Sequence, residues 1–174
     1  AYDSVDTPSG KTDNQLGGSA TYFSVASGYL TDVAVVAVVG RDFDPDDRSM
    51  LSDRGIDTSG LVQVEGDTFR WSGSYREDLN SAVTLETQLN VFADFAPELG
   101  DAHKALPFLF LANIDPTLQA SVLSQMTTRP KMVACDTMNL WIDIARPALV
   151  SLVEQVDILL INEAEAMQLT EADG

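Results

Sequence analysis

The chain alternates between short, continuously apolar runs and longer segments in which apolar and polar positions mix. The run Val33–Val39 is apolar throughout and rich in β-branched residues, a pattern typical of a strand buried on both faces of a parallel sheet. Other runs that predict strands are Leu61–Val64, Phe108–Ala112, Met132–Cys135 and Ile158–Ile161. Strands that alternate with helical segments predict an α/β fold in which a mostly parallel sheet is flanked by helices.

Start and stop signals predict the helices between these strands. Asp44 followed by Pro45 is typical of an N-cap and a first helical position, so a helix is expected to begin there. Gly55 is typical of the residue just past a helix end, and a turn is expected at Asp57–Gly60. The helices expected on these grounds span about Pro45–Arg54, Pro116–Met126 and Ile142–Val153.

Two glycines, Gly17 and Gly18, precede a helix rich in small residues. Because glycine has no Cβ, a ligand can approach main-chain amides at such a pair. Gly40–Asp42 follows the strand Val33–Val39, at the end of a parallel strand where ligands of open sheets bind. A tight turn without a ligand is the alternative interpretation of the pair. The bulky residues expected on the buried face of the helix are Tyr22, Phe23, Val25 and Tyr29.

The segment from residue 66 to 105 differs from the rest of the chain. Thr68–Tyr75 and Ala82–Leu89 are rich in Thr, Tyr, Trp and Ser and lack a helical period, which predicts antiparallel strands outside the main sheet. We therefore expect an α/β core formed by residues 1–65 and 106–174, with residues 66–105 forming a small β subdomain.

Composition narrows the class of protein. The 174 residues are 45% hydrophobic, which is enough for a buried core, and no apolar run approaches the roughly 20 residues of a membrane helix. No signal peptide is visible, so no membrane partner and a cytoplasmic location are expected. The single cysteine, Cys135, cannot form an internal disulfide and is interpreted as a core residue. A single histidine without a cysteine cluster argues against a zinc site.

Charge is strongly unbalanced, with 27 acidic and 10 basic residues and a formal net charge of −17. Such a surface repels phosphate backbones, so nucleic acid is not expected as a partner. Self-repulsion of this size destabilises a compact state unless salt screens it, which predicts a halophilic protein. An ordinary acidic cytosolic protein is the alternative.

Five segments, in this order and at these distances, resemble the PfkB carbohydrate kinases, a family with the ribokinase-like fold. The segments are GGSATYFSVA, VVGRDF, RGIDTSGLV, DTMN and LLINEAEAMQLT. The resemblance implies a sugar or nucleoside kinase, a transferase that moves the ATP γ-phosphate to a substrate hydroxyl with Mg²⁺. It also implies that the antiparallel strands form a lid over the sugar site. Family members often dimerise through these strands, so a homodimer is one expected arrangement, although the sequence leaves the oligomeric state open.

The resemblance assigns substrate-binding roles near the beginning of the chain. Asp3 is expected at the carboxyl end of the first strand, where its carboxylate accepts hydrogen bonds from substrate hydroxyls. Gly17 and Gly18 are expected to offer backbone amides to the same sugar, under a lid that carries Trp71. An exposed turn residue is the alternative for Asp3. Tyr22 stands where ribokinase-like sequences more often have a sugar-binding asparagine, so the substrate need not be ribose; a core residue is the alternative.

Asn162 and Glu165 have the N-x-x-E spacing that this family links to magnesium and phosphate. Magnesium usually keeps several waters, so one carboxylate can hold it with few direct contacts. The same two residues also form a helix-capping pair, and both roles are compatible. Asp136 and Asn139 follow a strand on the side where ligands collect, or simply form a turn.

The catalytic base of the resembled family is an aspartate in a G-A-G-D turn, and this sequence has no such turn. We therefore expect the base and the ATP site to lie beyond Gly174, in a full-length ATP-dependent carbohydrate kinase of which this fragment alone is inactive. The alternatives are a non-catalytic sugar- or nucleoside-binding module and a halophilic α/β domain whose glycines serve only for packing. The sequence does not identify which sugar or nucleoside binds.

Overall fold

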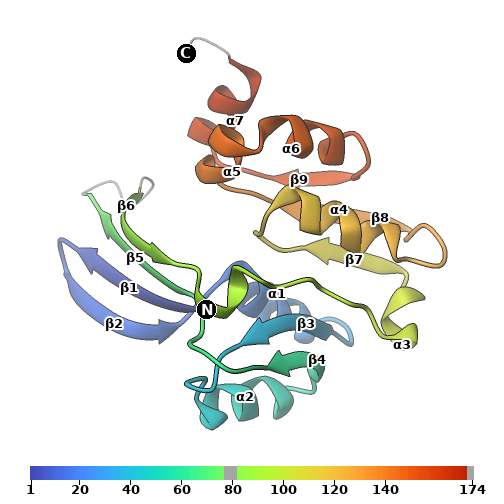
Figure 1. The fold of residues 1–174 in the computed structure, drawn as a ribbon, viewed down its shortest axis with the longest axis horizontal. Helices are drawn as coiled ribbons and strands as arrows, with labels where there is room; N and C mark the ends of the chain where they lie inside the picture. The colour runs from blue at the N-terminus through green and yellow to red at the C-terminus, as the bar shows by residue number, and fades with distance from the viewer. Residues whose placement is uncertain (77–81, 172–174) are drawn as a thin grey trace. The chain divides into compact units, whose positions relative to one another are not determined.

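The computed structural model describes residues 1–76 and 82–171 (Figure 1). The chain divides into two compact units, Ala1–Phe95 and Ala96–Gly174, and each unit is described by itself. Among the described residues, no helix combines the length and the apolar character needed to cross a membrane. The predicted α/β class, with parallel strands, flanking helices and an antiparallel portion, is confirmed.

The first unit contains a four-stranded mixed sheet and a two-stranded parallel sheet. The four-stranded sheet has the order β2-β1-β5-β6, and β3 pairs with β4 in the other sheet. Helices α1 and α2 flank β3 in the sequence (Figure 1). The elements are β1 (Tyr2–Thr7), β2 (Gly10–Leu16), α1 (Ser19–Gly28), β3 (Ala34–Val39), α2 (Pro45–Ser52), β4 (Asp57–Gln63), β5 (Arg70–Tyr75), β6 (Ala82–Gln88) and the 3₁₀ helix η1 (Asn90–Phe92).

The predicted antiparallel pair is confirmed as β5 and β6, but these strands share their sheet with a hairpin that the sequence analysis did not predict. Strand β1 runs antiparallel to β2 and parallel to β5. Strand β2 is exposed along nearly its whole length and is largely polar, so it lacks the alternation that identifies a half-buried strand. The four-stranded sheet thus includes residues on both sides of position 66, and the expected division into core and β subdomain stays a prediction.

Strands β3 and β4 pair in parallel over a small core. The expected strand Val33–Val39 is confirmed, but the turn expected at Asp57–Gly60 is wrong, because β4 already begins at Asp57. Gly60 is a strand residue here: a Cβ at this position would lie 2.8 Å from the carbonyl oxygen of Val35, so only glycine permits this approach. Clusters of buried side chains form the core: Tyr2, Val39, Phe43 and Leu61 in one, and Val35, Leu51 and Ile56 in the other.

Helix α1 places its small residues, and not its aromatic ones, against the core. Ser24 is buried, and Ala20 and Val25 pack against the cluster around Val35. The expected buried face is therefore wrong for the three aromatic residues, which are exposed: Tyr22, Phe23 and Tyr29. The apolar residues of this helix lie on several of its sides, so their periodicity does not identify the buried face.

The second unit contains a three-stranded parallel sheet of order β7-β8-β9, with α4 and α6 in contact (Figure 1). Leu111, Val133, Cys135 and Leu152 form its core, and Cys135 is fully buried, as predicted. The elements are α3 (Asp101–Lys104), β7 (Phe108–Leu111), α4 (Pro116–Ser124), β8 (Met132–Asp136), α5 (Asn139–Ile144), α6 (Arg146–Val153), β9 (Ile158–Leu160) and α7 (Glu163–Thr170).

The single helix expected at Ile142–Val153 is instead two helices. Helix α5 ends at Ile144 and α6 begins at Arg146, with Ala145 between them outside helical geometry (φ −132°, ψ 21°). Pro147 explains the break, because its ring lacks an N–H and clashes with the carbonyl four residues earlier in a continuous helix.

Candidate ligand-binding site

Asp3 and the glycine pair lie together, as the sequence predicted. The carboxylate of Asp3 occupies the space that a Cβ on Gly17 would fill, so the two residues can be this close only because Gly17 has no side chain. Gly18 is the N-cap of α1 and has φ +88°, a conformation that favours glycine. One expectation is corrected: Asp3 is the second residue of β1 and lies near its beginning, not at its carboxyl end.

Partial burial shifts the pKa of Asp3. Loss of solvent raises the pKa of its carboxyl above the ordinary value of 3.8, although the charge of the amino terminus of Ala1 and a hydrogen bond from the Gly18 main-chain N–H lower it in part. A carboxylate in such a place retains acceptor capacity but is costly to leave without further partners. Hydroxyl groups of a ligand are suitable donors for it.

The register of β1 and β5 places Asp3 and Trp71 on the same face of the sheet. The two residues are partners in the parallel pairing, and so are Tyr2 and Arg70, one position earlier. Because successive side chains of a strand point to opposite faces, Tyr2 and Arg70 lie on the other face. Trp71 covers Gly73 on its own strand and meets Tyr75 edge-on, with ring centroids 6.5 Å apart. The face that carries Asp3 therefore also carries an aromatic surface.

Tyr22 is not a core residue. Its side chain is 65% exposed, so the interpretation of Tyr22 as part of the core is wrong. Its contact with a ligand stays a prediction.

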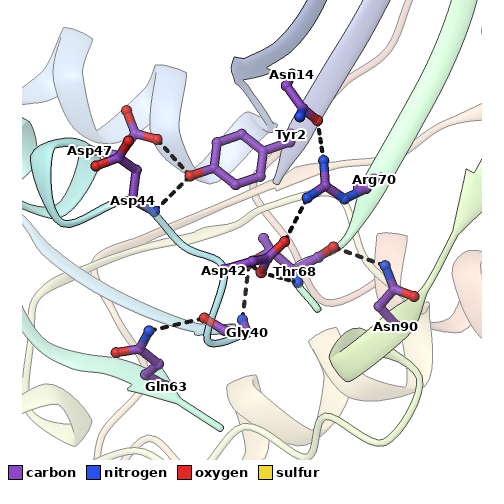
Figure 2. Close-up of polar contacts among 10 residues, drawn as sticks. All are labelled: Tyr2, Asn14, Gly40, Asp42, Asp44, Asp47, Gln63, Thr68, Arg70 and Asn90. Carbon is purple, nitrogen blue, oxygen red and sulfur yellow. Dashed lines mark hydrogen bonds and ion pairs between the residues drawn. The ribbon is translucent and has the colours of Figure 1, made fainter. Parts of the chain in front are cut away.

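The opposite face of the sheet is held by polar contacts that the sequence analysis missed (Figure 2). Asp42, in the loop after β3, accepts hydrogen bonds from the N–H and the hydroxyl of Thr68 and from the guanidinium of Arg70. The Thr68 hydroxyl also accepts from the N–H of Gly40, and a Cβ on Gly40 would overlap the backbone of residues 66–68. The sequence predicts a strand end at Gly40–Asp42 but does not identify the hydrogen-bond partners of Asp42, which lie 26 and 28 residues further along the chain.

In the second unit, Asn162 and Glu165 form the helix cap that the sequence offered as an alternative. The Asn162 side chain accepts from the N–H of Glu165 (2.9 Å), and the Glu165 carboxylate accepts from the N–H of Asn162 (3.0 Å). The capping role is therefore confirmed, and a magnesium or phosphate role stays a prediction. Across residues 1–76 and 82–171, no three His, Cys, Asp or Glu side chains are grouped so as to hold a metal directly.

A buried glutamine organises the strand ends near Asp136. Gln119 is 1% exposed, and its amide nitrogen donates to the carbonyls of Leu111, Ala112 and Asp136 at 2.9–3.1 Å. Asn139 accepts from the N–H of Leu140 at the start of α5. Asp136 is thus the last residue of β8 and Asn139 the first of α5, so neither lies in the expected turn, and a ligand role for them stays a prediction.

Neither a family model nor a curated protein matches the chain. Solved structures do match. The Burkholderia thailandensis nucleoside kinase, in complex with inosine, has a TM-score of 0.74 at 14% identity, over 98% of this chain and 60% of its own. A ribokinase from Cryptococcus neoformans var. grubii, in complex with ADP, has a TM-score of 0.73 at 15% identity, over 98% and 56%.

A fructokinase from Halothermothrix orenii is also similar, with a TM-score of 0.69 at 15% identity, over 99% of this chain and 69% of its own. The chain spans 56% to 69% of the length of these three kinases. At these identities the likeness concerns the fold, and the resemblance to PfkB kinases is confirmed at that level. The chain has the ribokinase-like fold of the PfkB sugar and nucleoside kinases.

Proposed function

We propose that this chain provides the acceptor-binding part of an ATP-dependent carbohydrate or nucleoside kinase. The observation that carries the proposal is the carboxylate of Asp3 set against Gly17 and Gly18, on the sheet face that also carries Trp71. The neighbours in fold are sugar and nucleoside kinases, one of them in complex with inosine.

The chemistry of these groups suits a polyhydroxylated ligand. One carboxylate accepts hydrogen bonds from two adjacent hydroxyls, and its charge strengthens each bond. Asp3 therefore binds the acceptor hydroxyls, and Gly17 leaves the space that its carboxylate needs. Trp71 and Tyr22 offer aromatic faces for a sugar or a base. The specific sugar or nucleoside is left open.

Phosphoryl transfer requires further groups. In the second unit, Asn162 and Glu165 are proposed to act on magnesium-bound water and phosphate, with Glu165 as the charged partner. Magnesium would neutralise charge on the transferring phosphoryl group of ATP. We propose that the base and the nucleotide site belong to other residues of the parent protein, and that this chain alone transfers no phosphate. A non-catalytic binding module is the second candidate, and the same acceptor groups favour it.

The proposal extends to the oligomeric state, the location and the partners of the protein. Strand β6 of the expected lid lies at an edge of its sheet, with β2 at the other edge, and such an edge is suited to pairing in a homodimer. A cytoplasmic, halophilic protein fits the charge of −17, and we propose no nucleic-acid or membrane partner.

Ligand binding by this chain tests the acceptor site. Inosine, adenosine, ribose and fructose are titrated by calorimetry in molar salt against the wild type, Asp3→Asn and the control Asp6→Asn. Asp6 lies on the same strand and forms an ion pair with Lys11 (2.7 Å). We expect Asp3→Asn to weaken binding by about tenfold or more, since charge-assisted bonds contribute about 1.5–3 kcal/mol each, while Asp6→Asn binds like wild type. Equal affinity of Asp3→Asn and wild type would contradict the proposal.

A coupled assay on the parent protein separates kinase from binding module. ATP turnover that depends on the ligand bound by this chain supports the kinase. Binding without turnover supports the module.

A further inference from the structure

We propose that Asp42, Arg70 and Tyr2 are positioning residues for Asp3: from the opposite face of the sheet, they fix the position in which β1 and β5 present Asp3 and Trp71 to a ligand. This inference rests on the proposed function of Asp3. It concerns residues that do not touch the ligand themselves.

The first anchor is the carboxylate of Asp42 (Figure 2). Its Oδ1 accepts from the N–H and the hydroxyl of Thr68, both at 2.7 Å, and its Oδ2 accepts from Nη2 of Arg70 at 2.6 Å. Arg70 also donates to the Asn14 side chain, at an irregular point of β2 where Asn14 has φ +53°. One carboxylate in the loop after β3 therefore holds the beginning of β5 and, through Arg70, the neighbouring hairpin.

The second anchor is the hydroxyl of Tyr2 on β1. It donates to Oδ2 of Asp47 at 2.8 Å and accepts from the N–H of Asp44 at 2.8 Å, which fastens β1 to the first turn of α2. Burial raises the pKa of the Tyr2 hydroxyl to about 12, so it stays a donor throughout the ordinary pH range. The guanidinium of Arg70 lies 5.5 Å from the centre of the Tyr2 ring, so the two anchors touch.

Strand alternation links these anchors to the ligand face. Tyr2 and Arg70 are partners across β1 and β5, and the next residues on each strand, Asp3 and Trp71, are also partners. Neighbouring residues of a strand point to opposite faces, so holding Tyr2 and Arg70 determines where Asp3 and Trp71 lie.

Burial distinguishes this network from ordinary surface contacts. Thr68 is fully buried, and the side chains of Arg70 and Asp42 are 31% and 24% exposed. Arg41, the residue before Asp42, forms an ion pair with Glu65, but both side chains of this pair are more than 70% exposed. Exposed pairs have little effect on structure, so Glu65→Gln is a matched control for Asp42→Asn.

The test follows the environment of Asp3 directly. NMR titration of the Asp3 carboxyl reports its raised pKa, which arises from burial of the carboxyl in its place against Gly17. We expect the Asp3 pKa to move back toward 3.8 in Asp42→Asn and in Tyr2→Phe, and to keep its wild-type value in Glu65→Gln. Tyr2→Phe keeps the ring and removes only the hydroxyl, so it decides the question if Asp42→Asn does not fold.

Binding provides the second readout. In the same variants, affinity for inosine is expected to fall by about tenfold, a change of about 1.4 kcal/mol, with no loss in Glu65→Gln. A wild-type Asp3 titration in a folded Asp42→Asn or Tyr2→Phe variant overturns the inference. If inosine and the other acceptors fail to bind wild type, the proposed function fails, while the titration still decides whether these residues position Asp3.

Discussion

Replacing Gly17 with alanine tests the closest contact of the candidate site. The added Cβ would overlap the Asp3 carboxylate: the Cγ of Asp3 would lie only 2.6 Å away, and the Cβ of Asp3 would be in tight contact at 3.3 Å. Gly17 itself has no left-handed φ, so alanine can adopt its backbone conformation. The substitution therefore acts by displacing Asp3.

The expected cost follows from this overlap. Displacement breaks the hydrogen bond that the Asp3 carboxylate accepts from the Gly18 N–H, and a lost hydrogen bond costs about 0.5–1.5 kcal/mol of unfolding free energy. The displaced carboxylate also loses its charge-assisted bonds to a ligand, which corresponds to about 10-fold to 100-fold in affinity. Gly17→Ala should thus lose both stability and acceptor binding.

Gly28→Ala is the matched control. A Cβ at Gly28 would lie 3.7 Å from Ile56, an ordinary contact, and Gly28 is the last residue of α1. Alanine there is expected to be neutral or to stabilise by about 0.4–1 kcal/mol. Urea unfolding in molar salt gives the stabilities, and calorimetry gives the affinities. If Gly17→Ala matched wild type in both, the contact between Asp3 and Gly17 would have no role in the site.

Three further predictions concern charge and capping. Burial alone would raise the pKa of the Asp42 carboxyl, but hydrogen bonds from Thr68 and Arg70 outweigh it and lower the pKa. The charged carboxylate therefore stabilises the fold above its unfolded pKa, and this stabilisation is lost as the pH falls through the lower folded pKa. Asp42→Asn should therefore reduce the unfolding free energy near neutral pH and much less in acid; an equal loss at both pH values would contradict this. Because the net charge is −17, the melting temperature should rise between low salt and molar salt by about 5 °C or more, equivalent to roughly 2 kcal/mol, and a flat profile would contradict the halophilic prediction. Asn162→Ala should remove the side chain that caps the Glu165 N–H at the start of α7 and lower the unfolding free energy by about 0.5–2 kcal/mol. The loss should be visible as faster amide exchange in α7, and unchanged exchange would contradict it.

The sequence predicted those parts of the fold whose signals are local. Val33–Val39 became β3 because its apolar run needs no partner to be recognised, and Asp44 caps α2 through its own near neighbour Asp46. The sequence does not reveal that Gly60 is a strand residue, because its role depends on the backbone of Val35, which lies 25 residues earlier in the chain. The polar strand β2 carried no signal at all.

The candidate site divides in the same way. Asp3 and the glycine pair were assigned through family resemblance, and the structure brings them together. The exposure of Tyr22 was not foreseeable, since an aromatic residue on a helix fits either a core or a surface. Asp42 and Arg70 were missed because their pairing crosses 28 residues and leaves no periodic trace in either segment.

The two faces of β1 and β5 have consequences for how such a protein can diverge. Substitutions at Asp3 or Trp71 alter recognition while the attachments through Tyr2 and Arg70 persist, so new specificities can arise without rebuilding the scaffold. A deletion of one residue within either strand has a different effect, because it moves the side chains of one face to the other face. A residue that attaches the strand to the scaffold would then point toward the ligand. We expect natural length variation to accumulate in the tight connection around Ser9, and to spare the strands themselves.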